Sequence, residues 1–317
     1  MKRSAPLGRT VGGSLVISMT IALAACSSSG GDGDGPTGAG GSGLPGEGKP
    51  AITMGDKNFA EEYVLGELYS QALEAKGFSV TLKGNIGSSA VIDKALTSDK
   101  IDMYPEYTGV IYTELAKLGD RPKSAQQTLA GATNYEKKRG FAVLKPTPFQ
   151  DADGLAVLKD YAAQHNLKTI SDMRNVGSFT YAGPPENGTR YQGVIGLKQA
   201  YGLNKIQFKP LGIGLQYQAL DQQKVDSIAI FTTDPQLASG KYAVLTDTKG
   251  IFGYQQVVPV ISQKVLDEEG PAFANTLNAV SALLTTEAIV AMNKAVQIDQ
   301  KDPAEVAKAF LEANHLA

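Results

Sequence analysis

The sequence predicts a two-lobed α/β protein in which each lobe is a mostly parallel sheet flanked by helices. Strand and helix patterns alternate along the chain, and this alternation is typical of α/β lobes. Residues 95–108 also align without a gap on residues 219–232, so that Tyr107-Thr108 matches Phe231-Thr232. Internal similarity at this spacing is too long for a solenoid repeat and indicates two lobes of related construction. Without its N-terminal segment, the chain is still long enough for two domains that each bury a core.

The first half begins with an apolar strand at 51–54 and a turn at 55–58. Apolar residues then recur at helical spacing until Lys76-Gly77, which is typical of a helix end. Alternation over 78–82 predicts the next strand, and a serine of the loop at 84–89 is placed to cap the helix that carries residues 91–96. A strand over 100–104 leads into Asp102-Met103-Tyr104-Pro105-Glu106-Tyr107-Thr108-Gly109, where Tyr107 is expected at the strand end.

Helices are predicted over 110–118 and 124–139, and strands over 141–144 and 155–158. The first pattern then restarts. The second-half elements are a strand over 179–182, a helix over 190–201, a strand over 206–208, a helix over 215–223 and a strand over 225–230. The segment 251–261 is rich in strand formers and is expected to return to the first lobe. Terminal helices are predicted over 271–285, 287–296 and 303–314, the last with Asp302 as its cap.

The N-terminus has the pattern of an export signal. A cationic start is followed by an apolar run over 15–25, which is too short for a comfortable transmembrane helix. The ending Leu23-Ala24-Ala25-Cys26 resembles the lipobox of bacterial lipoproteins, which implies lipidation of Cys26. Cys26 is the only cysteine, so no internal disulfide is possible. Residues 27–50 are rich in Gly and Ser and are expected to form a flexible tether to the outer face of the cell membrane.

The charge balance argues against one class of partner. The formal net charge is −2, so no basic excess is available to neutralise the phosphates of a nucleic acid. A small neutral or zwitterionic ligand is compatible with this charge. No cofactor and no metal are expected, because the chain has only two histidines and no zinc-type spacing.

The candidate ligand-binding residues follow strand ends in both halves. Lys57 and Arg190 each follow the first strand of a half, near a helix start that favours an anion. Tyr107 and Phe231 present aromatic faces that attract a cation. In open α/β sheets, ligands lie beyond the carboxyl ends of the strands. These four residues therefore suit a zwitterion, with its carboxylate on the cations and its ammonium on the rings.

These motifs resemble those of the substrate-binding proteins of osmoprotectant ABC importers. The resemblance rests on Asp-Lys-Asn-Phe with Glu61, Pro-Glu-Tyr-Thr-Gly, Gly-Thr-Arg opening a helix, and Val-Asp followed by Thr-Thr-Asp. It implies the type II periplasmic-binding-protein fold with two crossings between the lobes. The implied boundaries are 51–152 with 255–317 for lobe 1 and 153–254 for lobe 2. It also implies capture of glycine betaine, choline or carnitine and delivery to a membrane permease driven by a separate ATPase subunit.

The resemblance assigns site residues and also shows where this chain departs from the family. Lys57 and Arg190 match the residues that hold the ligand carboxylate, and Tyr107 matches a tyrosine of the ammonium cage. Other cage tyrosines are replaced by Asp153, Phe231 and Gln255, although Tyr254 is adjacent to Gln255 and is able to serve. A family threonine aligns with Val110. These replacements also suit an amino acid or another cationic amine whose nitrogen carries protons.

An enzyme is the main competing class, and the sequence favours a binding protein that is not an enzyme. His165 and His315 lie outside the predicted cleft, and no nucleophile elbow is present. A hydrolase that uses Asp151, Asp153 or Glu106 as acid and base remains the alternative. Glu106 and Asp234 are interpreted as residues that brace loops.

Overall fold

The computed structural model describes residues 43–118 and 121–317. The predicted leader, Cys26 and residues 27–42 of the predicted tether lie outside the described residues. Residues 43–50, at the end of the tether, differ from the flexible segment expected. They form turns, and the Gly46 N–H donates to the Lys76 carbonyl over 2.9 Å, which holds this stretch against the end of the first helix.

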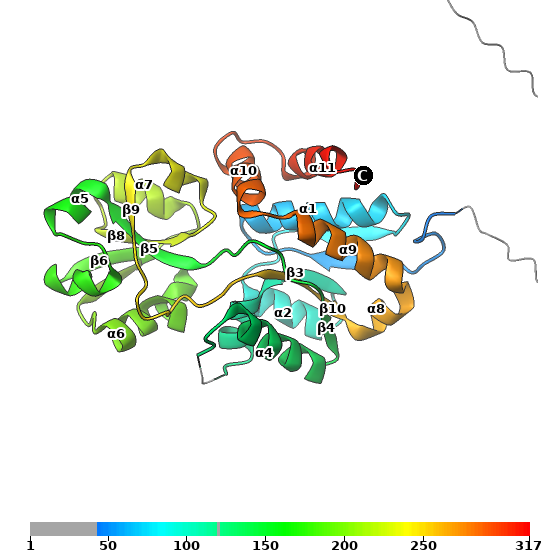
Figure 1. Cartoon of the computed structure of the whole chain (residues 1–317), viewed down its shortest axis with the longest axis horizontal. Helices are drawn as coiled ribbons and strands as arrows, with labels where there is room; N and C mark the ends of the chain where they lie inside the picture. The colour runs from blue at the N-terminus through cyan, green and yellow to red at the C-terminus, as the bar shows by residue number, and fades with distance from the viewer. Residues whose placement is uncertain (1–42, 119–120) are drawn as a thin grey trace, which may run out of the picture. The chain divides into compact units, whose positions relative to one another are not determined.

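The sheet of lobe 1 contains five strands in the order β2-β1-β3-β10-β4 (Figure 1). The strands are β1 (Ile52–Gly55), β2 (Val80–Lys83), β3 (Met103–Tyr107), β4 (Phe141–Val143) and β10 (Val257–Ser262). β1 pairs parallel with β2 and β3, whereas β10 is antiparallel to both β3 and β4. Four strands therefore run in one direction and β10 alone is reversed.

The sheet of lobe 2 repeats this plan in the order β7-β6-β8-β5-β9. Its strands are β5 (Asp153–Leu158), β6 (Phe179–Gly183), β7 (Ile206–Pro210), β8 (Ser227–Phe231) and β9 (Tyr242–Leu245). β5 is antiparallel to β8 and β9, as β10 is to β3 and β4. The predicted fold class, two α/β lobes with mostly parallel sheets, is confirmed.

The internal repeat predicted from sequence also has matching hydrogen bonds in the two lobes. An aspartate just before β3 in lobe 1, or β8 in lobe 2, accepts from the N–H of a threonine on β1 or β6. A lysine on β2 or β7 donates to the carbonyl two residues before that aspartate. The pairs are Asp102–Thr53 at 2.7 Å and Lys83–Lys100 at 2.9 Å in lobe 1, and Asp226–Thr180 at 2.7 Å and Lys209–Lys224 at 3.0 Å in lobe 2. The aligned segments therefore have the same structural role.

Helices cover both faces of each sheet (Figure 1). In lobe 1 they are α1 (Ala60–Glu74), α2 (Ser89–Thr97), α3 (Thr108–Val110), the π-helical η1 (Ile111–Leu115), α4 (Ala125–Lys138), α8 (Gln263–Glu269), α9 (Pro271–Leu283), α10 (Thr286–Gln297) and α11 (Pro303–Ala313). In lobe 2 they are α5 (Lys159–Gln164), η2 (Ile170–Asn175), η3 (Pro185–Gly188), the π-helical η4 (Tyr191–Ile195), α6 (Gly196–Tyr201), α7 (Leu215–Asp221) and η5 (Pro235–Ser239). The chain thus buries apolar side chains on both sides of two separate sheets.

Some elements differ from the sequence-based expectation. The motif at residues 102–109 lies mostly within β3, whereas the strand was expected over 100–104. β3 extends to Tyr107 because β10 pairs with it up to the match of Val257 with Tyr107. The helix predicted from Arg190 is broken at Gly193, where a Cβ atom would lie 2.1 Å from the Asn187 carbonyl oxygen. The predicted strand region 251–261 contains β10 only from Val257. The elements α5, η2, η5, β9 and α8 were not predicted.

Two crossings connect the lobes, as predicted. One follows β4 and the other precedes β10, and they run antiparallel with a bridge between Gln150 and Gln256. The Asp151 N–H also donates to the Gln255 carbonyl over 3.0 Å. Among the described residues, no single helix is long and apolar enough to cross a membrane; α9 and α10 reach this length only together and bend by 87° between them.

Candidate functional site

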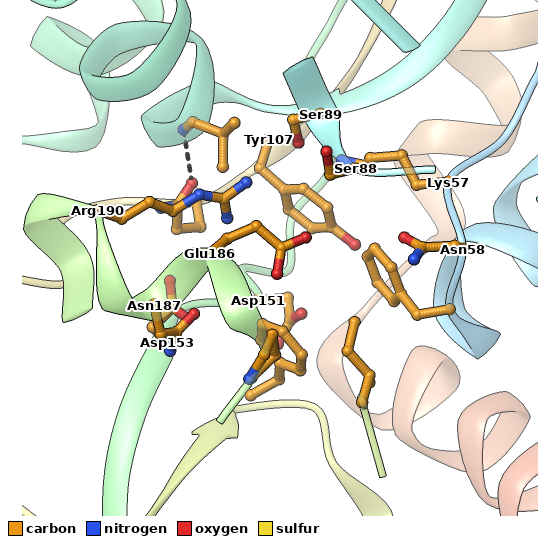
Figure 2. A pocket seen from close by; sticks show the side chains of 16 residues that line it. Lys57, Asn58, Ser88, Ser89, Tyr107, Asp151, Asp153, Glu186, Asn187 and Arg190 are labelled. Atoms are coloured by element: carbon orange, nitrogen blue, oxygen red, sulfur yellow. Dashed lines mark hydrogen bonds between the residues drawn. The ribbon is translucent and has the colours of Figure 1, made fainter. Parts of the chain in front are cut away.

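A cavity lies between the two lobes and is lined by residues of both (Figure 2). The space that the centre of a water molecule can reach inside it is about 60 Å³. About 10–15 Å³ of this measure holds one water, so the cavity suits a compact ligand. Its lining comprises Lys57, Asn58, Phe59, Ser88, Ser89, Tyr107, Val110, Asp151, Asp153, Pro184, Glu186, Asn187, Arg190, Ile213, Phe231 and Gln255. Six of the seven predicted ligand-binding residues are therefore brought together, and Tyr254 is not.

Three aromatic rings form one wall of the cavity. Phe59 lies between Tyr107 and Phe231, with ring centroids 6.3 Å from Tyr107 and 5.9 Å from Phe231. The rings are nearly parallel, with interplanar angles of 23° and 15°. Tyr107 ends β3 and Phe231 ends β8, so the repeated architecture places equivalent aromatics on the two lobes. Phe59 joins them into one apolar surface.

Lys57 lines the same wall, but its charge is already paired. Its Nζ lies 2.5 Å from Glu106 Oε1 and 3.3 Å from Glu62 Oε1, and the residue is only 2% exposed. The same Nζ lies 4.3 Å from the Tyr107 ring centroid. Burial raises the pKa of Glu62 to about 8, against the lowering effect of Lys57. Lys57 therefore stabilises buried carboxylates, and little of its charge is left for a ligand carboxylate.

Glu61 connects the aromatic wall to the second lobe. Its Oε1 accepts from the Tyr107 hydroxyl over 2.8 Å. Its Oε2 accepts from Thr233 Oγ1 over 2.6 Å and from Asn293 Nδ2 over 2.7 Å. Burial raises the pKa of the Glu61 carboxyl, while these hydrogen bonds lower it. Thr233 belongs to the loop after β8, so the bond from Thr233 to Glu61 is an interlobe hydrogen bond.

Arg190 supplies the second cation of the cavity. It immediately precedes η4 and lies across the cavity from the wall that carries Lys57 (Figure 2). Its Nε is 3.8 Å from Glu114 Oε2 of lobe 1, a loose ion pair between half-buried side chains. The planar guanidinium keeps donors for a carboxylate, which it binds well through two hydrogen bonds.

Three carboxylates face the same space. Asp153 pairs with Phe231 in the β5–β8 ladder, and burial raises its pKa to about 6, against the lowering effect of Arg190. Burial also raises the pKa of Asp151 well above its usual range, with a further contribution from the Glu61 charge. Glu186 lies in η3, and its buried Oε2 has no hydrogen-bond partner among the described residues.

Gln255 and Tyr254 have different positions. Gln255 is 1% exposed and lines the cavity, with its Oε1 accepting from the Val110 N–H over 3.1 Å. The Tyr254 side chain lies outside the cavity, because its hydroxyl donates to the Lys123 carbonyl over 3.0 Å. The suggestion that Tyr254 replaces the cage tyrosine aligned with Gln255 is therefore not supported by its position.

The two loop-bracing interpretations agree with the structure. Glu106 Oε1 accepts from the Tyr107 N–H over 2.7 Å in addition to binding Lys57. Asp234 Oδ2 accepts from the Phe231 N–H over 2.8 Å and from the Tyr217 hydroxyl over 2.7 Å. Each carboxylate thus fixes the backbone of a cavity-lining aromatic.

Sequence reasoning missed Phe59, Glu186 and Asn187 as cavity-lining residues. Phe59 follows Lys57 in the turn after β1, and Glu186 lies in the equivalent turn after β6. The rule that ligands lie beyond the carboxyl ends of strands covers both turns, so it also predicts a place at the site for their other residues. Within the described residues, no group of three or more His, Cys, Asp or Glu side chains has an arrangement that would hold a metal ion.

A family model described as the substrate-binding domain of ABC-type glycine betaine transport systems matches residues 50–313. The chain belongs to this family. Its members are substrate-binding components of ABC importers, which places this domain outside the cytoplasm. The glycine-betaine-binding protein of Pseudomonas aeruginosa is 28% identical over 280 residues, which cover 84% of this chain and 88% of that protein.

Two further proteins are similar to this chain. A Helicobacter pylori protein described as an ergothioneine transport permease and ergothioneine-binding protein is 28% identical over 268 residues, which cover 84% of this chain and 48% of that protein. A crystal structure described as a glycine betaine/carnitine/choline ABC transporter has a TM-score of 0.69 at 23% identity, covering 84% of this chain and 99% of that chain. The structural likeness supports the fold of this family member.

Proposed function

We propose that this family member captures a small zwitterionic or quaternary ammonium osmoprotectant, of the glycine betaine, choline or carnitine class, in the cavity between its lobes. The observation that carries the proposal is that one cavity between the lobes combines an aromatic wall with a guanidinium on the side opposite Lys57. The relatives named for glycine betaine support this ligand class. The protein with ligand in its cavity then delivers that ligand to an ABC permease with a separate ATPase subunit.

Each side chain has a distinct part in this proposal. Arg190 binds the ligand carboxylate, since its guanidinium is only loosely paired. Tyr107 and Phe231 contact the cationic end, with Phe59 completing the wall. Asp153 and Gln255 contact polar groups of the ligand. Lys57 is assigned a supporting part, because Glu106 already forms a close ion pair with it.

We assign no catalytic activity to the cavity. Glu106 is fully buried and bonded to Lys57 and to the Tyr107 backbone, so it is not free to act as an acid or base. Asp151 accepts from the Thr233 N–H over 3.1 Å. Both carboxylates have structural partners, which favours binding over hydrolysis.

The proposal also includes a membrane anchor and lobe boundaries. The Leu-Ala-Ala-Cys sequence supports lipidation of Cys26, which would hold the protein at the outer face of the membrane. Binding to the membrane would then occur through the N-terminal lipid alone. Lobe 1 comprises residues 51–152 and 255–317, and lobe 2 comprises residues 153–254, since the chain passes between the sheets at these points.

Calorimetric titration of the purified chain tests this function. Glycine betaine, choline and carnitine are each titrated into the wild type, into Tyr107→Ala and into Arg190→Ala. We expect saturable binding of at least one compound by the wild type. Tyr107→Ala removes an aromatic face and Arg190→Ala removes charge-assisted hydrogen bonds, so each should weaken the affinity for the ligand by about tenfold or more. Arg174→Ala, at an exposed arginine of lobe 2, is the matched control and should bind normally. Absence of wild-type binding to all three compounds would overturn the proposal. Conversion of any of them to a product would overturn it as well.

A further inference from the structure

The aromatic wall of the cavity already faces a cation of the protein itself. The Lys57 ammonium lies 4.3 Å from the Tyr107 ring centroid and 5.7 Å from the Phe59 ring centroid. The attraction of an aromatic face for a cation depends on the negative potential over the ring. A positive charge held that close offsets part of this potential, and it repels a second cation placed at the same rings. The wall therefore differs from a cage whose faces are all free for a quaternary ammonium.

The carboxylates of the cavity, in contrast, have free acceptor atoms. Asp151 is only 5% exposed, and the protein donors that it has among the described residues all bind its Oδ1, leaving Oδ2 free. Glu186 Oε2 is buried and has no hydrogen-bond partner within residues 43–118 and 121–317. Asp153 has Asn187 as a donor and Arg190 as the nearby charge. All three side chains line the cavity, and Figure 2 shows them beside its central space.

The charges of the lining favour a cationic ligand group. The described lining residues include three acidic side chains and two cations, Lys57 and Arg190. Lys57 is in addition bonded to Glu106 and Glu62, which lie behind the wall. Arg190 is thus the one lining cation in the described chain without a close carboxylate partner.

We propose that Glu186, Asp153 and Asp151 form an acceptor site for a ligand nitrogen that carries N–H groups, so that this cavity prefers a protonated amine to its trimethylammonium counterpart. The inference rests on the proposed function, since it concerns the ligand nitrogen in the same cavity. When a ligand displaces the water from a buried acceptor and offers no donor, the acceptor is left without a hydrogen bond, and this weakens binding of that ligand. A trimethylammonium has no N–H to give, whereas a primary ammonium has three donors for three carboxylates. Glu186 is the specificity-determining residue of this site, because its Oε2 has no protein donor.

Matched ligand pairs that differ only in N-methylation test the inference. Glycine betaine is compared with glycine, and choline with ethanolamine, by calorimetric titration at one pH at which both amines are protonated. For each pair the selectivity is the affinity ratio of the amine over its trimethylated partner. In the wild type we expect a selectivity of about tenfold or more in at least one pair, because the hydrogen bonds to charged acceptors are made only by the amine.

Isosteric variants assign the selectivity to residues. Glu186→Gln and Asp153→Asn each replace a charged acceptor by a neutral one of similar shape, and each should lower the selectivity by about fivefold. Glu305→Gln, at an exposed glutamate of α11, changes the net charge equally and should leave the selectivity unchanged. If Glu305→Gln lowers the selectivity as much as Glu186→Gln does, the effect belongs to the overall charge and the proposed acceptor site is overturned.

The remaining outcomes separate this inference from the proposed function. If the wild type binds the trimethylated partners as tightly as the amines, or more tightly, the inference is overturned while the proposed function stands. If the amines are preferred but neither cavity variant changes the selectivity, the acceptor assignment is overturned. If no compound of either pair binds and carnitine does not bind either, the proposed function fails and the inference fails with it.

Discussion

Lys57 shows how the surroundings of one residue change its interpretation. In the sequence it is a cation near a helix start, and its position after the first strand suits an anion site. In the structure its ammonium lies 2.5 Å from Glu106 and 3.3 Å from Glu62, behind a wall that contains Tyr107. These carboxylates come from α1 and β3, and sequence spacing does not show that both converge on one lysine. Arg190 has a looser carboxylate partner at 3.8 Å, so the carboxylate-binding role remains a prediction for this cation.

Asp153 leads to a prediction about pH. Burial raises its pKa to about 6; Arg190 lowers it, and the Glu114 and Asp234 charges raise it further. Below this pKa the carboxyl is neutral and attracts a cation less strongly. Affinity for choline, whose charge does not change with pH, should therefore increase from pH 5 to pH 7 by up to about tenfold.

Calorimetry of choline binding at several pH values checks this prediction. Asp153→Asn removes the titrating group, so the affinity of this variant for choline should rise less than that of the wild type between pH 5 and pH 7. Asp99→Asn is the control, because Asp99 is exposed and its positive φ of 53° suits asparagine. A rise that is equal in wild type and Asp153→Asn would contradict the assignment.

At the scale of elements, α1 of lobe 1 is joined to the loop after β8 of lobe 2 by the bond between Glu61 and Thr233. The carboxylate is buried and also receives the Tyr107 hydroxyl, so the contact between lobes reaches the cavity wall. Thr233→Val keeps the shape of the side chain and removes its hydroxyl donor. A hydrogen bond to a charged buried group contributes about 1.5–3 kcal/mol. Ligand affinity should therefore fall by about tenfold or more.

Calorimetric titration with the tightest ligand of the wild type measures this effect. The control is Thr97→Val, at an exposed threonine whose hydroxyl bonds within α2 to the Asp93 carbonyl. Unchanged affinity in Thr233→Val would show that this bond does not help to hold the lobes together around the ligand.

The elements themselves were largely predictable, because their signals are local. The strands β1, β6 and β8 are apolar runs, and Asp302 accepts from the Ala304 N–H as a helix cap should. β9 and α8 were missed, since neither carries a strong period. The cavity was harder to predict. The predicted strand ends identified Tyr107 and Phe231 as cavity residues. The stacking of Phe59 between these rings, and the Glu186 oxygen without a partner among the described residues, depend on packing between segments that are distant in sequence.

At the scale of the molecule, one sheet plan is used twice and joined by two crossings. The matched strand orders bring equivalent strand ends, and therefore Tyr107 and Phe231, from the two lobes to one cavity. The crossings add Asp151 and Gln255 to its lining, and the first residue of β5 adds Asp153. Binding in such a cavity requires both lobes, so the ligand itself becomes part of the contact between them.

A crystal structure of this chain with a bound ligand tests that central claim most directly. We predict that the ligand lies between the lobes, with its carboxylate or polar end at Arg190 and its nitrogen near Tyr107 and the carboxylates of the cavity. A ligand found in another cavity, or in contact with residues of only one lobe, would contradict it.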